Sequence, residues 1–206
     1  MPVQRWLCLA SVIRPYRPAD LGALYDICLR TGASGSDASN VVADPRLFGD
    51  VYAAPYAALE PELAFVVEDD DGVAGYVLGA LDTDAFAARC EREWWPALRA
   101  AHPEGSGARA VDQILVSLIH HPHRRAAAVI ARFPSHLHID LLPRVQGHGW
   151  GRRLLDTEAD ALRAAGSPGL HFGVGVSNER ALAFYRHLGY EAWGSDGVSI
   201  TFTRAL

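Results

Sequence analysis

The clearest pattern in the chain is a change of hydrophobic period after residue 137. From Leu137 to Leu142, apolar side chains alternate with histidine and aspartate, which is the period of a half-buried strand. Over 150–165 the apolar positions fall at helical spacing and are expected to face inward: Leu154, Leu155, Ala159, Leu162 and Ala165. The charged positions of that helix are expected mostly on its solvent side: Arg152, Arg153, Asp156, Glu158, Asp160 and Arg163.

A second strand is predicted directly after this helix. Gly166 and Pro168 end the helix, and the run from Leu170 to Val176 is rich in valine and phenylalanine. Strand, helix and strand in close succession predict a parallel pair of strands joined by a crossover helix. A short helix follows, capped by Asn178 or Ser177, with these residues inward: Ala181, Leu182, Tyr185 and Leu188.

Further elements are predicted on both sides of this unit. Strands are expected over Trp6–Ile13, Leu63–Val67 and Val73–Leu81, the last two joined by a hairpin turn at Asp69–Gly72. Helical segments are expected over Pro18–Thr31 and Asp44–Leu59, the first with these residues inward: Leu21, Leu24, Tyr25 and Leu29. Helical patterning also fills about 83–135, which is long for a connection between two strands and is typical of an insertion that shapes a pocket or an interface.

Composition limits the class of protein. With 206 residues, half of them apolar, one domain spanning 1–206 is expected. The net charge of −5 argues against nucleic acid as the main partner, and no apolar run reaches the roughly 20 residues of a membrane span. Three scattered cysteines favour a reducing compartment such as the cytoplasm. A homodimer stays open, because exposed sheet edges can pair.

The link between the first strand and the helix is rich in glycine. Its sequence, Gln146-Gly147-His148-Gly149-Trp150-Gly151, places main-chain N–H groups at a helix N-terminus, where they can converge on a phosphate. It is not the G-x-G-x-x-G of dinucleotide-binding folds, and it lacks the Gly-Lys-Ser/Thr ending of nucleotide hydrolases. The pattern therefore predicts a site for another phosphorylated cofactor.

Two motifs in this region resemble the GNAT-type N-acetyltransferases. Gln146, Gly149 and Gly151 match the family's Gln/Arg-x-x-Gly-x-Gly/Ala, and a downstream pattern is matched by Asn178, Ala181, Phe184, Tyr185, Gly189 and Tyr190. The segments 111–114 and 137–143 are also similar to the acetyltransferase-like domain of eukaryotic O-GlcNAcases and its stand-alone bacterial relatives. The resemblance covers most of the chain, with the motifs in about 136–191.

The resemblance implies an α/β fold with a mixed, mostly antiparallel sheet, helices on both faces, and a central parallel pair that splays apart. It implies acetyl-CoA as co-substrate, with pantetheine between the splayed strands and the diphosphate on the N–H groups of Gln146 through Gly151. Residues expected to help with the remaining phosphate are Arg144, His148, Arg152 and Arg153. Asn178 is expected to bond the pantetheine amides, or only to cap its helix.

Acetyl transfer to an amine requires a proton acceptor. Asp140, His138 and His136 share one face of the predicted strand; Asp140 is the first choice and His138 the second, with a water relay as a further option. Asp140 can instead simply pair with a neighbouring histidine. The oxyanion is expected to bond the main-chain N–H of Leu141 or Leu142. By its place in the family pattern, Tyr185 is expected to protonate the departing CoA thiolate, or to be only a packed aromatic residue.

Other functions fit parts of the sequence. One alternative is a relative that binds acetyl-CoA without turnover, a function for which the intact glycine turn is sufficient. A metal-dependent hydrolase would draw on two groups: His136, His138 and Asp140, and His120, His121 and His123. That function leaves the glycine turn and the 178–190 pattern unexplained, so no metal is predicted. The prediction is a direct N-acetyltransferase acting in a ternary complex, whose acceptor among small amines, lysines, N-termini and amino sugars is open.

Overall fold

A computed structural model describes residues 11–206 and contains one seven-stranded sheet. The strand order is β1-β2-β3-β4-β5-β7-β6, and every neighbouring pair is antiparallel except β4 and β5. The strands are β1 (Val12–Pro15), β2 (Ala64–Asp69), β3 (Gly72–Ala80), β4 (Ser135–Leu141), β5 (Gly169–Gly175), β6 (Glu191–Ser195) and β7 (Ser199–Ala205). The predicted mixed, mostly antiparallel sheet with a central parallel pair is therefore confirmed.

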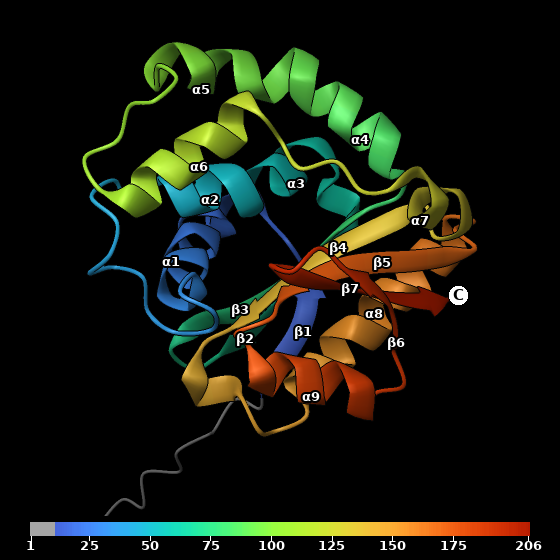
Figure 1. The fold of residues 1–206 in the computed structure, drawn as a ribbon. Helices are drawn as coiled ribbons and strands as arrows, with labels where there is room; N and C mark the ends of the chain where they lie inside the picture. The colour runs from blue at the N-terminus through green and yellow to red at the C-terminus, as the bar shows by residue number, and fades with distance from the viewer. Residues whose placement is uncertain (1–10) are drawn as a thin grey trace, which may run out of the picture.

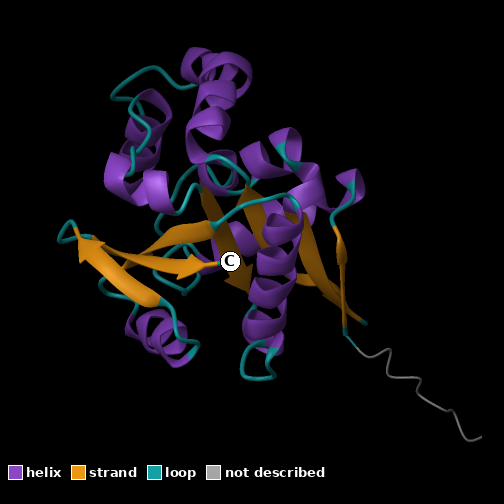
Figure 2. Ribbon diagram, turned by 90° about the vertical axis from the view of Figure 1, so that its right-hand side faces the viewer, coloured by secondary structure: helices purple, strands orange, loops and turns teal. Residues whose placement is uncertain are grey.

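Helices cover both faces of the sheet (Figures 1 and 2). One face carries α1 (Leu21–Thr31), α2 (Leu47–Tyr52), α3 (Ala54–Leu59), α4 (Thr83–Arg89), α5 (Trp95–Ala101) and α6 (Ala110–His120). The other carries α8 (Trp150–Ala164) and α9 (Glu179–His187). The remaining helical segments are short: η1 (Pro18–Asp20), η2 (Pro61–Leu63), the π-helical η3 (Cys90–Trp94), α7 (Ala127–Arg132) and η4 (Pro143–Val145).

The alternation in β4 distributes its side chains between these two faces. Leu137 belongs to the core beneath α8, and Ile139 and Leu141 pack against that core. His136, His138 and Asp140 lie on the opposite face, because successive side chains of a strand point to opposite sides. The face under α1–α6 therefore receives all of the polar side chains that this strand contributes between 136 and 140.

The segment between β3 and β4 contains α4 to α7, as the helical patterning over 83–135 predicted, and α4–α6 arch over one face of the sheet (Figure 1). Asp112 at the start of α6 is 1% exposed and accepts hydrogen bonds from the main-chain N–H groups of Ala43 (2.9 Å) and Arg109 (2.8 Å). Of the adjacent tryptophans, Trp95 is buried in the core, and the Trp94 indole N–H donates to the Asp50 carbonyl (2.9 Å). These contacts attach the segment to the body of the fold.

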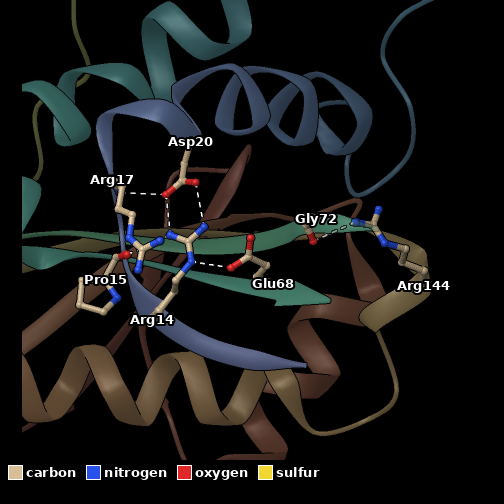
Figure 3. A network of polar contacts seen from close by, with 7 residues as sticks. All are labelled: Arg14, Pro15, Arg17, Asp20, Glu68, Gly72 and Arg144. Carbon is tan, nitrogen blue, oxygen red and sulfur yellow. Dashed lines mark hydrogen bonds and ion pairs between the residues drawn. The ribbon is translucent and has the colours of Figure 1, made fainter. Parts of the chain in front are cut away.

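An ion-pair network holds the edge strand β1 (Figure 3). The Arg14 guanidinium donates to both carboxylate oxygens of Asp20 (2.6 and 2.8 Å) and to Glu68 of β2 (2.6 Å). The predicted strand Trp6–Ile13 overlaps β1 only at its end; residues 6–10 lie outside the described residues. Leu21, expected inward, is 37% exposed, because the helix proper begins there.

Two expectations for α8 are wrong. Ala165 follows the last helical residue and is exposed, whereas Glu158, expected on the solvent side, is completely buried. Position 158 lies midway between Leu154 and Leu162 on the apolar stripe, so helical spacing alone places it inward. The side chain fits only because residue 79 of β3 is glycine: a Cβ there would lie 1.7 Å from a Glu158 carboxylate oxygen.

Two of the three cysteines, Cys28 and Cys90, are free and buried; Cys8 lies outside the described residues. Among residues 11–206, no helix combines the length and the apolarity needed to cross a bilayer.

Candidate functional site

The parallel strands β4 and β5 pair only at their N-terminal ends. Ser135 lies opposite Leu170 and His136 opposite His171; beyond these positions the two strands are no longer partners. On its other side β4 stays paired with β3 as far as Leu141. The sheet thus contains a gap that opens toward the C-terminal ends of β4 and β5, as predicted.

Hydrogen-bond alternation decides which main-chain groups of β4 face the gap. The Leu142 N–H donates to the Ala74 carbonyl (2.8 Å), so the even-numbered residues of this segment bond to β3. The N–H groups of Ile139 and Leu141 point the other way, toward β5. Leu142 was one of two expected oxyanion donors; its N–H is already used, which leaves Leu141.

The glycine-rich turn presents a series of free donors at the start of α8. Gly147 and Gly149 have φ values of 79° and 82°, a left-handed conformation that favours glycine. Within the described part of the chain, no protein acceptor is found for the N–H groups of 147–152, four of which, 149–152, are the unpaired donors of a helix N-terminus. The Gln146 N–H, expected to join them, bonds instead to the Pro143 carbonyl (3.1 Å).

The side chains near the turn are only partly available for a phosphate. Gln146 Nε2 donates to the Leu141 carbonyl (2.6 Å), which fixes the turn against the end of β4. Arg144 reaches back to the β2–β3 hairpin, where it pairs with Asp69 (2.9 Å) and approaches the Gly72 carbonyl (Figure 3). The guanidinium is therefore engaged at the hairpin, and a role in binding the phosphate stays a prediction. Arg153 stacks on Trp150 (4.6 Å), and His148 and Arg152 are exposed.

A cleft of about 1060 Å³ lies on the α1–α6 face of the sheet and includes the gap. Its lining brings together segments far apart in sequence. From β4 it includes His136, His138, Ile139 and Asp140; from β5 and α9 it includes Gly173, Val174, Gly175, Asn178, Ala181 and Tyr185. Aromatic side chains of α2, α3 and α4 also line it: Tyr52, Tyr56 and Phe86.

Asp140 and His138 form a pair inside the cleft. His138 Nε2 lies 3.0 Å from Asp140 Oδ2, and the Tyr76 hydroxyl donates to the same oxygen (2.6 Å). Burial lowers the pKa of His138, but the Asp140 carboxylate and the nearby Cys28 thiol outweigh it and raise that pKa to about 10. The imidazole is therefore protonated at neutral pH. The pairing of Asp140 with a histidine, one of the two roles expected from the sequence, is present.

The neighbouring histidines have the opposite protonation state. Burial, with the nearby His171 and Arg125, lowers the pKa of His136 to about 3. Burial also lowers the pKa of His171, whose Nδ1 bonds the Phe133 carbonyl (2.7 Å). Both rings are thus neutral, and of these three histidines His138 is the charged one.

Tyr185 and Asn178 occupy the β5 side of the cleft. The Tyr185 ring packs on Phe172 (centroids 4.5 Å apart) and is 7% exposed; burial and the charge of Asp140 raise the pKa of its hydroxyl. The Asn178 side chain accepts from the Ala181 N–H (3.1 Å) and so caps α9. The packing and capping roles of these residues are real, and both residues still line the cleft.

This combination of a splayed parallel pair, a glycine turn at a helix N-terminus and a cleft between them agrees with one family. Residues 38–190 match the model of the acetyltransferase (GNAT) family. The chain belongs to the GNAT family.

The chain is also similar in sequence to two curated proteins. Over 180 residues the chain is 28% identical to the protein O-GlcNAcases of Rattus norvegicus and Mus musculus. The match covers 86% of this chain but only 20% of each enzyme, so this GNAT chain spans about a fifth of the length of those relatives.

Solved structures agree with the fold. The crystal structure of SsHAT is similar, with a TM-score of 0.89, 41% identity, and coverage of 95% of this chain and 98% of that one. The fold is shared by two more distant proteins: yncA of Salmonella typhimurium (TM-score 0.57, 16% identity, 96% and 94% coverage) and a phosphinothricin acetyltransferase of Sinorhizobium meliloti (0.58, 18%, 96% and 89%).

The metal site considered from the sequence does not assemble in this GNAT fold. In residues 11–206, metal-ligand spacing is found for Cys28, His138 and Asp140, whose donor atoms lie within 4.8 Å of one another. His136, His120, His121 and His123 are not in that group. Cys28 and Tyr76 were missed by sequence reasoning, because only the pairing of β3 with β4 and the packing of α1 bring them beside Asp140.

Proposed function

We propose that this GNAT protein is an acetyl-CoA-dependent N-acetyltransferase that moves the acetyl group directly to an amine. The main support for this function is the gap between β4 and β5. It is continuous with a cleft and leaves strand-edge N–H groups unpaired. An extended amide-containing arm can pair with such an edge as an additional strand would. The acetyl-CoA bound to yncA and to the Sinorhizobium meliloti enzyme supports acetyl-CoA as that ligand.

The diphosphate of acetyl-CoA would rest on the free N–H groups of Gly147, His148, Gly149, Trp150 and Gly151. These donors point from the N-terminus of a 15-residue helix, so the helix dipole adds to the attraction for an anion. Arg152 is exposed in the first turn and is free to approach the remaining phosphate.

The reaction would join the amine nitrogen to the thioester carbonyl carbon and break the bond from that carbon to sulfur. The oxyanion formed in between would accept from the Leu141 N–H, which points into the gap. Tyr185 would return a proton to the CoA sulfur, because burial keeps its hydroxyl protonated.

Asp140 is the proton acceptor that the geometry favours. His138 holds its proton at neutral pH and so has no free lone pair for the amine, whereas Asp140 lies in the cleft. The Tyr76 hydroxyl already donates to Asp140 Oδ2, and protonated His138 lies 3.0 Å from the same oxygen, so that oxygen is occupied in the free protein. That same observation favours a second candidate function, an acetyl-CoA-binding protein without turnover.

Calorimetric titration with acetyl-CoA, followed by a panel of amines scored by release of free thiol, tests both functions. Binding with amine-dependent thiol release supports the transferase. Binding without release by any amine supports the binding protein. Absence of binding at millimolar acetyl-CoA contradicts both.

A further inference from the structure

One motif of the sequence has no part in acetyl-CoA binding or in the proton transfers. The segment 120–125 reads His-His-Pro-His-Arg-Arg, five imidazole or guanidinium side chains in six residues of a chain with net charge −5. All six residues line the cleft. Arg124 and Arg125 place two permanent positive charges on the cleft wall of an acidic protein, which requires an explanation from the ligand.

Arg125 is the member of this segment that lies against the sheet. A Cβ on Gly173 of β5 would lie 2.3 Å from Arg125 Nη2 and 3.0 Å from its Cζ. The guanidinium therefore rests directly on the β5 backbone, and any side chain at 173 would displace it. Arg99 of the same region pairs with Glu91 (2.8 Å), but for Arg125 no carboxylate or carbonyl partner is found within residues 11–206.

Register places Arg125 near the closed end of the gap, where β4 and β5 are still paired. Gly173 is two residues beyond His171, the last residue of β5 that pairs with β4. The glycine turn follows the far end of β4, ten residues after His136. Because the diphosphate would bind at the glycine turn, the phosphates of acetyl-CoA would lie away from Arg125.

A second group beside Arg125 also lacks a partner. His171 is completely buried and lines the cleft; its Nδ1 bonds a carbonyl, but its Nε2 has no hydrogen-bond partner. With the ring neutral and Nδ1 donating, Nε2 is an acceptor. A buried acceptor without a donor is unfavourable, so the site is complete only when a ligand supplies an O–H or N–H group.

We propose that the acceptor is a small amine that carries an anionic group, carboxylate or phosphate, and that Arg125 binds this group near the closed end of the gap. The inference rests on the proposed transferase function and adds the class of acceptor. Arg125 is a specificity-determining residue, and His171 Nε2 accepts from a hydroxyl or N–H group of the same ligand. A guanidinium suits either anion, because both accept its paired N–H donors.

The test compares amines matched except for the anion. Glycine against glycinamide probes a carboxylate; ethanolamine phosphate against ethanolamine, and glucosamine 6-phosphate against glucosamine, probe a phosphate. We expect at least one anionic member to exceed its neutral partner by about tenfold or more in kcat/KM, as one hydrogen bond to a charged group implies. Whether the carboxylate or the phosphate pair shows the preference identifies the anion.

Variants connect the preference to Arg125. Arg125→Gln should reduce the ratio of kcat/KM for the anionic amine to that for its neutral partner to about one, while Arg125→Lys should retain part of the preference. Arg163→Gln, which removes the same charge from an exposed site on α8, should change nothing. Equal rates for anionic and neutral members, zero included, or a preference that survives in Arg125→Gln, overturn the proposal.

Acetyl-CoA affinity separates this inference from the function on which it rests. It should be the same for wild type and Arg125→Gln. Loss of affinity in Arg125→Gln would assign the guanidinium to the cofactor and overturn the acceptor proposal. Absence of affinity in the wild type would instead contradict the transferase itself.

Discussion

The two faces of the sheet treat buried polar groups differently. On the α1–α6 face, His138, Asp140 and Tyr76 contact one another and border a cleft. On the α8 face, Glu158 is buried alone, and neither of its carboxylate oxygens has a partner. Glu158 comes from α8, which packs closely on its face of the sheet, whereas the helices of the other face leave a cleft open.

The comparison shows two outcomes of burying an ionisable group. The Asp140 charge raises the pKa of His138 to about 10 and keeps that group charged, whereas burial raises the pKa of Glu158 to about 8 and keeps that group neutral. A paired charge beside a cleft is available for chemistry. A neutral carboxyl in a closed core affects stability alone. Tyr185 connects the two faces at the gap between β4 and β5. Its side chain belongs to the core on the α8 side and also lines the cleft on the other side.

Tyr185→Phe tests whether the α8 side contributes to the chemistry. Turnover should fall by roughly 10²–10⁴-fold, the range for a lost general acid, while acetyl-CoA affinity stays unchanged because the ring still packs. Steady-state rates and calorimetry measure the two quantities. Tyr190→Phe, in the same aromatic cluster, is the matched control and should keep full turnover. Lost affinity with unchanged turnover would restrict the chemistry to the other face.

Asp140→Asn tests the charged pair. Turnover should fall by about 100-fold and its pH dependence should flatten. The pKa of His138 should drop from about 10 to below its ordinary value of 6.5, because burial then acts without the carboxylate. The stabilisation by protonated His138, which in the wild type is complete below pH 6.5 and lost as pH rises through about 10, should disappear. Ring NMR titration and activity profiles measure these changes; an unaltered rate profile would remove Asp140 from the mechanism.

Glu158→Gln tests whether the α8 face is closed. The folded pKa of about 8 exceeds the ordinary 4.5, so wild-type stability should decrease as pH rises from 4.5 toward 8. The variant stays neutral and should be more stable than wild type by roughly 4 kcal/mol at pH 8, with little difference at pH 4. Urea unfolding at both pH values measures this. Glu191→Gln, at an exposed position, should show no such difference; equal curves for Glu158→Gln would mean that water reaches the carboxyl.

Gly149→Ala should produce the smallest effect, at the N-terminal end of α8. Its φ of 82° is unfavourable for alanine by about 1–2 kcal/mol, so the turn should shift and acetyl-CoA affinity should fall about tenfold. Gly166→Ala has a similar φ of 91° at the other end of the same helix. Gly166→Ala should lose about as much stability as Gly149→Ala but keep the wild-type affinity for acetyl-CoA. Equal affinity of both variants would place the diphosphate elsewhere.

Much of the fold could be predicted from local patterns. The alternation in 137–142 gave β4, the helical spacing after Gly149 gave α8, and the aspartate-glycine turn gave the β2–β3 hairpin. The contacts and the burial of individual side chains were less predictable. Arg144 is near the turn in sequence but bonds to the hairpin, and Glu158 looks exposed by its charge but is buried by its spacing.

The sequence by itself determined the succession of strands and helical regions as far as α9, the position of the glycine turn and the family, because periodicity and short motifs are local properties of the chain; β6 and β7 were not predicted. Only the tertiary structure decided that Cys28 and Tyr76 surround Asp140, that Leu141 rather than Leu142 faces the gap, and that Arg125 rests on Gly173. These relations depend on strand register and on helices packed from distant segments. Hydrogen-bond alternation and burial act between elements, so no spacing within one element reveals them.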